Sequence, residues 1–141
     1  MAHLPQSAIE LIESGANAHL VTINPDGSPQ VSMIWPGVDK GEIVVGHLHF
    51  HQKLRNVERD PRVVLSIEGP GRNGLGLRDY LVVNGTARIV EGGAPELLAL
   101  LAPRFLGPGV AFPPAGAPDG WLLRIKPERI GGSGPWTEDS A

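Results

Sequence analysis

The chain has 141 residues, and none of them is cysteine. It can therefore form no disulfide, has no thiolate nucleophile and offers no sulfur ligand to zinc or to an iron–sulfur cluster. Long apolar runs are also absent, and residues 1–10 lack the basic start and apolar stretch of a signal peptide. These absences predict a soluble protein of the cytoplasm that is neither exported nor inserted into a membrane.

Positive charge is scarce. Twelve lysines and arginines stand against fifteen aspartates and glutamates, so the formal net charge at pH 7 is −3. Proteins that bind nucleic acid usually present a basic face to its phosphate backbone. We therefore expect no nucleic-acid partner, and a site for an anion has to be a local concentration of donors.

Glycine and proline are abundant, with 19 and 14 residues, and they punctuate the chain between apolar segments. This pattern is typical of strands joined by turns, and a hydrophobic fraction of 41% is enough for one core, so residues 1–141 are expected to form a single domain. Six strands with only three helices to cover them favour a closed barrel over a parallel sheet. The predicted strands are 18–23, 28–38, 43–48, 62–67, 77–90 and 121–125, and the predicted helices are 5–15 (within the N-terminal segment 1–15), 50–59 and 94–105.

The remaining segments are predicted to be turns and loops. Residues 68–76 form a glycine-rich, flexible connection, and Gly85 marks a bulge or kink in the long strand that follows. Residues 107–119 hold four prolines, too many for a central strand or helix, so they form a stiff loop of the kind that often borders a site. Residues 132–141 are expected to be a mobile tail.

Residues 51–62 concentrate hydrogen-bond donors at a strand-to-helix junction. Lys53 lies in the first turn of the predicted helix, where backbone N–H groups and the helix dipole favour negative charge. Arg55 and Asn56 add directional donors, and a guanidinium can bind a phosphate through two hydrogen bonds. From the spacing alone, the simpler interpretation is a solvated helix whose arginines pair with neighbouring carboxylates.

Four segments together carry a resemblance to a known family. In order they read DGSPQVSMIW, GEIVVGHL, KLRNVERDPRVVLSI and LVVNGTARIV, and from about residue 18 to 130 the chain resembles the pyridoxamine-phosphate-oxidase-like split-barrel superfamily. The most specific element is the Lys-x-Arg-Asn-x-x-x-Asp-Pro-Arg stretch at residues 53–62, and its companion is Gly85-Thr86-Ala87. The resemblance implies a mainly β fold, a six-stranded antiparallel split β-barrel of the FMN-binding type with short flanking helices.

The resemblance also implies a set of cofactor-binding residues. Donors at the start of the second helix would bind the cofactor phosphate, the second strand would face or flank the ring, and a histidine at the end of the third strand would lie beside the phosphate. A tyrosine on a later strand would approach the ring from the dimer interface. The residues in these positions are Lys53, Arg55 and Asn56 for the phosphate, Ser32, Met33, Ile34 and Trp35 for the ring, and His47 and Tyr80.

The opening pattern LxTxxPDGxPxVSxxW, at residues 20–35, looks most like the compact branch of the superfamily that uses the deazaflavin coenzyme F420. Gln52 stands where pyridoxamine-phosphate oxidases usually carry an arginine, and their long C-terminal extension is missing, so oxidation of vitamin B6 is not expected. The resemblance therefore implies F420 as cofactor, with FMN as the alternative. It implies hydride transfer to or from a small conjugated organic acceptor, and a homodimer with the cofactor pocket at the interface.

Several questions stay open from the sequence. No obligatory catalytic side chain follows, because the cofactor carries the redox chemistry, and Tyr80, a histidine or bulk water could supply the proton. Arg72 and Arg78 would favour F420, which has an acidic tail, if they lay near the pocket. Both could equally be solvated charges of a loop. A protein that only carries the cofactor, or binds haem, is a further alternative.

Two other chemistries are less consistent with the sequence. His47, His49 and His51 alternate and would share one face of an extended strand, as metal ligands do, but no cysteine or carboxylate triad accompanies them. No metal is therefore expected. Ser32 is not surrounded by the strained turn of a serine hydrolase, which argues against that class.

Overall fold

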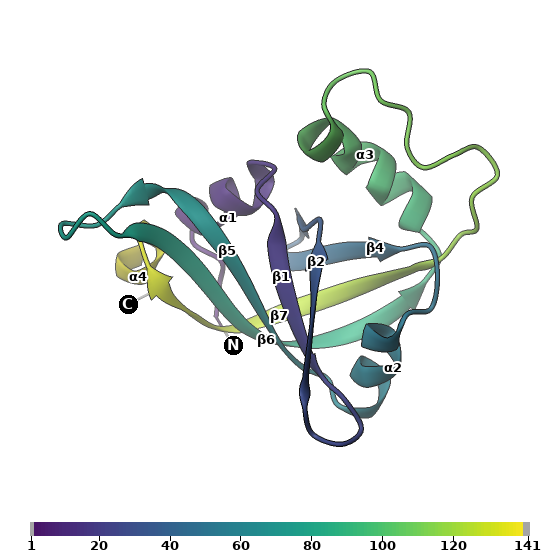
Figure 1. Cartoon of the computed structure of the whole chain (residues 1–141), viewed down its shortest axis with the longest axis horizontal. Coiled ribbons are helices and arrows are strands. Elements are labelled where there is room, and N and C mark those ends of the chain that lie inside the picture. Colours follow the sequence, from purple (N-terminus) through teal and green to yellow (C-terminus); the bar gives the residue numbers. More distant parts are fainter. Residues whose placement is uncertain (1, 140–141) are drawn as a thin grey trace.

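In a computed structural model, which describes residues 2–139, seven strands form one antiparallel sheet in the order β2-β1-β5-β6-β7-β4-β3 (Figure 1). The mainly β, antiparallel fold class predicted from the sequence is confirmed, with seven strands in place of six. No helix within residues 2–139 is long and apolar enough to cross a membrane. The elements are α1 (Gln6–Glu13), β1 (Ala18–Ile23), β2 (Pro29–Ile34), β3 (Gly37–Asp39), β4 (Glu42–His47), α2 (Gln52–Arg59), β5 (Arg62–Arg72), β6 (Arg78–Glu91), α3 (Ala94–Leu106), β7 (Trp121–Ser133) and α4 (Pro135–Asp139).

The extra strand arises because the predicted strand 28–38 is broken in two. Only Trp35 and Pro36 separate β2 from β3, yet these strands lie at opposite ends of the strand order. A two-residue link spans roughly 10 Å at most, so the two edges of the sheet must meet at this point. The sheet is thus rolled into a barrel that is split between its edge strands.

The barrel is filled by alternate residues of its strands, as expected for sheets with one buried face. Leu20, Leu65, Leu81 and Leu123, from four neighbouring strands, are all fully buried. Helix α1 adds three buried residues to the same core, Ala8, Leu11 and Ile12.

Helix α3 packs on β4 at a position where the strand has no side chain. A Cβ atom built on Gly46 would lie 3.2 Å from Leu98 Cγ, so any larger residue would push the helix away. Leu98 and Leu101 of this helix are buried against the barrel, while Leu100 is 65% exposed. The loop that follows, residues 107–120, has no regular structure, as predicted, and Ala94 N–H donates to Asp119 O to hold its far end.

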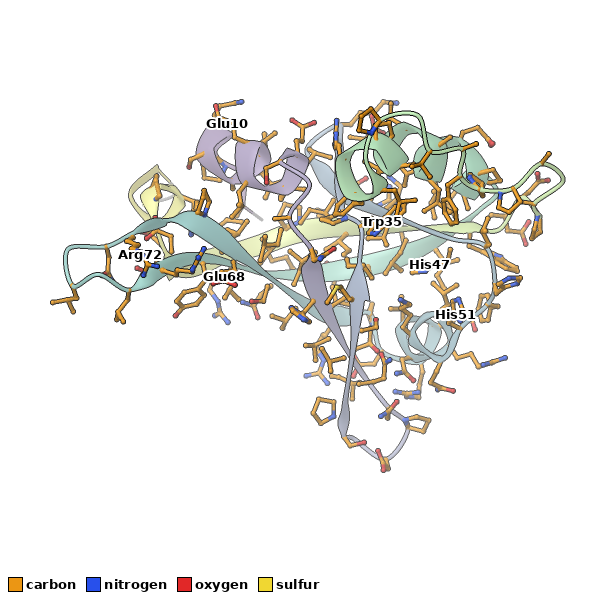
Figure 2. All side chains as sticks on the ribbon, turned by 45° about the horizontal axis from the view of Figure 1, so that its top comes forward. Glu10, Trp35, His47, His51, Glu68 and Arg72 are labelled. Atoms are coloured by element: carbon orange, nitrogen blue, oxygen red, sulfur yellow. The ribbon has the colours of Figure 1, made fainter. Side chains whose placement is uncertain are left out.

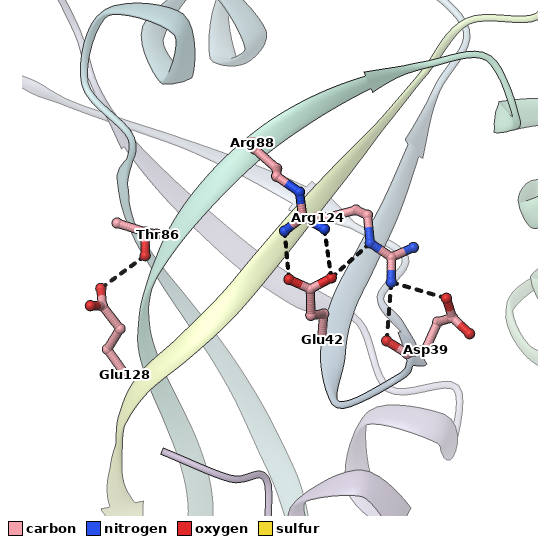
Figure 3. Close-up of polar contacts among 6 residues, drawn as sticks. All are labelled: Asp39, Glu42, Thr86, Arg88, Arg124 and Glu128. Carbon is pink, nitrogen blue, oxygen red and sulfur yellow. Dashed lines mark hydrogen bonds and ion pairs between the residues drawn. The ribbon is translucent and has the colours of Figure 1, made fainter. Parts of the chain in front are cut away.

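An ion-pair network ties four strands together on the outside of the barrel (Figure 3). The Glu42 carboxylate of β4 accepts hydrogen bonds from Arg88 of β6, at 2.5 and 3.0 Å, and from Arg124 Nε of β7, at 2.8 Å. Arg124 also donates to Asp39 Oδ2 at 2.9 Å. These contacts, Arg88 foremost, lower the pKa of Glu42 to about 2.

The sheet extends further than the sequence predicts at its far end. The predicted flexible loop 68–76 is instead mostly hairpin, because β5 continues to Arg72 and Asn73 Oδ1 accepts the N–H groups of Leu75 and Leu77 in the turn. The bulge predicted at Gly85 is confirmed by a shift of register between Asn84 and Gly85.

The C-terminal segment is packed on the barrel where a mobile tail was predicted. Strand β7 runs through Ser133 and the short α4 follows it. Trp136 is only 4% exposed, and its indole N–H donates to Tyr80 O at 3.2 Å. The last two positions of the predicted tail, 140 and 141, lie outside the described residues.

Candidate functional site

A cavity of about 280 Å³ opens where β2 and β4 end and α2 begins. Most of its wall is apolar, and its polar groups gather on the side formed by the start of α2. Pockets of this kind, apolar with a few polar groups, are the usual form of a small-molecule site. Three of the labelled side chains in Figure 2, Trp35, His47 and His51, belong to this wall. The lining residues are Met33, Ile34, Trp35, Val45, Gly46, His47, Leu48, His49, His51, Lys53, Leu98 and Phe112.

Lys53 provides the positive charge of the cavity. It lies in the first turn of α2, and its side chain is directed toward β2, where Nζ donates to Ser32 Oγ at 3.1 Å. The residue is only 9% exposed, and burial lowers the pKa of its ammonium. None of the ion pairs within residues 2–139 includes it. A buried ammonium with three donors and no counter-ion is costly, so the site favours an anionic ligand.

His47, the last residue of β4, lies beside this ammonium. It is 6% exposed, and its Nε2 atom is buried without a hydrogen-bond partner in the described part of the chain. Burial, together with the nearby charges of Lys53 and His51, lowers the pKa of His47 to about 3, so the ring is neutral at pH 7. Buried polar atoms are nearly always paired, and one left unpaired at a cavity wall indicates that a ligand supplies its partner.

The three alternating histidines do not share one strand face as the sequence suggested. Strand β4 ends at His47, so His49 and His51 follow on a bent segment. The ring of His51 lies 6.2 Å from that of His47 and 6.0 Å from that of His49, measured between centroids. The described residues contain no group of three or more histidine or acidic side chains placed to hold a metal ion.

Asn56 differs from its predicted role as a phosphate ligand. It is completely buried, and its Nδ2 donates to Thr22 Oγ1 and Asn24 Oδ1, each at 3.0 Å. Its Oδ1 accepts from Gln52 Nε2 at 2.9 Å. Because both N–H donors are already used, Asn56 fastens α2 to the β1–β2 hairpin and has no donor left for a phosphate.

Arg55 also lies outside the cavity. It is exposed on α2, and its guanidinium carbon sits 5.9 Å from the centroid of the Phe50 ring. The guanidinium is thus held against an aromatic face rather than directed into the pocket. Arg55 is therefore not among the residues that line the cavity.

Tyr80 lies at the opposite end of the barrel from the cavity. In the sheet, Tyr80 of β6 pairs with Ser133 at the end of β7. His47 of β4 pairs with Trp121 at the start of β7, and Trp121 also pairs with Glu91 at the end of β6. The eleven positions between Tyr80 and Glu91 correspond to roughly 35 Å of strand. Arg72 lies at that same distant hairpin end (Figure 2). Within one chain neither side chain reaches the cavity, so only a second copy could bring Tyr80 to it.

Aromatic side chains form the wall opposite Lys53. Trp35 stacks on Phe105 of α3 with ring centroids 5.0 Å apart and planes 3° from parallel. Phe112, from the loop 107–120, meets the same indole at 5.5 Å and 60°. The sequence predicted Trp35 and a loop bordering the site, but Phe112 and Leu98 were missed, because only the folded chain brings them to the cavity.

The fold and the cavity can now be compared with known proteins. A family model described as pyridoxamine 5'-phosphate oxidase matches residues 5–133, and the chain belongs to this family. A solved structure named F420 reductase is 30% identical, with 91% of this chain and 98% of that chain covered and a TM-score of 0.74. A conserved hypothetical protein from Mycobacterium tuberculosis is 28% identical, with coverage of 89% and 81% and a TM-score of 0.71.

More distant structures share the fold alone. A protein from Vibrio cholerae described as a haem storage protein is 20% identical, with 92% of this chain and 94% of that chain covered and a TM-score of 0.63. No curated protein matches the sequence significantly. The split barrel predicted from the sequence is thus confirmed.

Proposed function

We propose that the protein binds coenzyme F420 in the cavity beside Lys53 and transfers a hydride between it and a small conjugated organic acceptor, with FMN as the alternative cofactor. The observation that carries the proposal is the Lys53 ammonium, which is buried at the cavity without a counter-ion. An anionic group on the ligand would supply the missing charge. The 30% identity to a structure named F420 reductase adds support for the deazaflavin.

The cofactor phosphate fits at the start of α2. The N–H groups of Leu54 and Arg55 bond to His51 O, which leaves those of Gln52 and Lys53 outside the hydrogen bonds of the helix. Backbone donors at a helix N-terminus favour an anion, and the Lys53 ammonium adds a full charge at the same place. Lys53 and the helix start therefore take the role that the sequence resemblance gave to Lys53, Arg55 and Asn56 together.

The ring of the cofactor fits along the end of β2. Met33, Ile34 and Trp35 line the cavity there, and Gly46 leaves space on the facing strand. When bound, the reduced deazaflavin supplies the hydride. The chain holds the ring against an apolar wall, excludes water from one face and leaves the other face to the acceptor. His49 and His51, which are exposed at the cavity wall, are placed to exchange a proton with solvent.

We also propose that the protein is a homodimer that uses the outer face of β1 and β2. Val31 and Met33 of the edge strand β2 are 60% and 57% exposed. Next to them Val21, Ile23 and Val64 line a hollow of about 640 Å³, together with the charged residues Arg62, Glu128 and Arg129. An exposed apolar surface on an edge strand favours coverage by another chain. Met33 lines the cavity as well, so a partner on this face would lie next to the site.

The dimer can be tested by sedimentation at micromolar concentration. Val31→Glu should shift the protein to monomer and weaken F420 binding, because the partner wall of the pocket is lost. Val110→Glu, at an exposed valine on the loop 107–120, is the control and should leave the dimer intact. A monomeric wild-type protein would refute the proposed assembly.

The cofactor can be tested by titrating the purified protein with F420 and with FMN and following fluorescence. We expect tighter binding of F420 and a loss of about ten- to a hundredfold in Lys53→Ala, the usual effect of removing a hydrogen bond from a charged donor. Lys126→Ala, an exposed lysine on β7, is the control. Reduced F420 with menadione as acceptor then tests turnover. Tight binding without turnover would indicate a cofactor carrier, and a preference for FMN would reverse the order of cofactors.

A further inference from the structure

The polar side of the cavity contains four nitrogen bases and no acid among the lining residues. His47 comes from the end of β4, His51 and Lys53 from the start of α2, and His49 from the segment between them. The other lining residues, from β2, β4, α3 and the loop 107–120, are apolar. Ser32 of β2 adds a hydroxyl through its hydrogen bond with Lys53. None of residues 2–139 that line the cavity is acidic. A bound phosphate would therefore be the only negative charge facing these groups in the cavity.

Among residues 2–139, no protein group pairs with Nε2 of His47. The atom is buried, and the residue as a whole is more than nine-tenths buried. Without a ligand, burial is the main reason that the pKa of this ring is low, and the charge of Lys53 is the second reason. A phosphate at Lys53 would offset that charge and offer an acceptor to Nε2, and both effects favour the protonated ring.

We propose, building on the cofactor site inferred above, that His47, which the sequence resemblance places beside the cofactor phosphate, takes up a proton when the phosphate binds. In the free protein, a neutral His47 ring avoids the repulsion that a second cation next to Lys53 would cause. In the complex, a protonated ring raises the affinity for the cofactor, because two cations then face one phosphate. Since the proton is bound more firmly in the complex than in the free protein, affinity falls as pH rises through the pKa of His47 in the complex.

The proton uptake can be measured by NMR titration of the histidine ring signals. The chain has five histidines, and His47→Gln identifies the signal of interest by removing it. In the free protein we expect no titration of His47 between pH 5 and 8. With F420 bound, its midpoint should rise into this range, by roughly four pH units. The same deazaflavin without its phosphate and tail should leave the midpoint unchanged.

Two outcomes separate this inference from the proposed function. If F420 binds and the His47 midpoint stays where it is in the free protein, the inference is refuted and the cofactor site stands. If F420 does not bind to the wild-type protein, both are refuted.

A binding measurement gives a second test that does not depend on assigning the spectrum. His47→Gln should weaken F420 binding about tenfold at pH 6 and far less at pH 9, which flattens the pH dependence of affinity. His19→Gln, which changes an exposed histidine of β1 away from the cavity, should keep the wild-type pH dependence. If His47→Gln does not fold, the smaller His47→Asn takes its place in both tests, with the same expected results.

Discussion

Lys53 Nζ donates a hydrogen bond to Ser32 Oγ at 3.1 Å across 21 positions of sequence. The pair joins the start of α2 to β2 and fixes the ammonium at the polar side of the cavity. A hydroxyl orients the cation but does not neutralise it. The protein therefore keeps a buried positive charge ready for a ligand, at a cost to its own stability.

Lys53→Met should make the ligand-free protein more stable and weaken its binding of the cofactor. Methionine has nearly the same length and needs no hydration, so we expect the free energy of unfolding to rise by about 1 kcal/mol. Urea denaturation of the two proteins without ligand measures the difference. Lys126→Met at an exposed site should change it by less than about 0.5 kcal/mol. A clear loss of stability in Lys53→Met would show that the ammonium is already satisfied without a ligand.

Asn56→Ala should act on stability. Three hydrogen bonds of a fully buried amide are lost, and Thr22 and Asn24 lose their partner, so the free energy of unfolding should fall by about 2–4 kcal/mol. Arg55→Ala on the exposed side of α2 serves as the comparison and should stay within about 0.5 kcal/mol of wild type. A stable Asn56→Ala with weak cofactor binding would instead restore the phosphate role predicted from the sequence.

Glu42→Gln should reveal a pH-dependent contribution of the ion-pair network. The pKa of Glu42 is about 2 in the folded protein, against 4.5 as its ordinary value. Because the folded value is the lower one, the contribution is complete above about pH 4.5 and is lost as pH falls toward 2. At pH 7 we expect Glu42→Gln to be about 1–2 kcal/mol less stable, a figure reduced for solvent screening.

The difference in stability between wild type and Glu42→Gln should therefore shrink below pH 4.5. Thermal unfolding of both proteins at a series of pH values measures it. Glu68→Gln, at an exposed pair with Arg78, should cost less than about 0.5 kcal/mol at any pH. A wild-type advantage that stayed constant down to pH 2.5 would mean that the carboxylate is not held in its charged form by the two arginines.

Phe112→Ala should change how the acceptor is used and leave the cofactor in place. Phe112 contacts Trp35 at the cavity wall and comes from the loop 107–120, whereas the proposed phosphate site is at Lys53 on α2. Loss of an aromatic contact of about 0.5–1.5 kcal/mol should raise KM for menadione roughly three- to tenfold. The Kd of F420 should change less than twofold. Val110→Ala in the same loop is the control, and a matching loss of cofactor affinity in Phe112→Ala would place Phe112 in the cofactor site instead.

The strands and helices were predictable where local pattern decides them. Strand β1 occupies the predicted residues 18–23, and Gly85 forms the predicted bulge because a Cβ atom there would lie 2.5 Å from Lys126 O. The break at Trp35 and Pro36, which divides the predicted strand 28–38 into β2 and β3, was not predictable from the apolar residues of that segment. It depends on the closure of the sheet into a barrel, which involves strands far apart in the sequence. Strand β7 was predicted too short for a similar reason, since its charged outer residues resemble a loop until β6 pairs with them.

The candidate site was predictable in part. The position of Lys53 in the first turn of a helix follows from sequence, and so does the placing of Met33 to Trp35 on one strand end. The role of Asn56 was not predictable, because its amide is claimed by Thr22 and Asn24, more than thirty positions earlier. A donor in a sequence shows what it can bind, whereas its folded neighbours determine what it does bind.

The claim that Lys53 holds the cofactor phosphate is tested most directly by a four-way comparison of affinities. F420 and the same deazaflavin without phosphate and tail are titrated into wild type and into Lys53→Met. We predict that wild type prefers F420 by at least about tenfold and that Lys53→Met loses most of this preference while its affinity for the phosphate-free ring is unchanged. An undiminished preference for F420 in Lys53→Met would contradict the account.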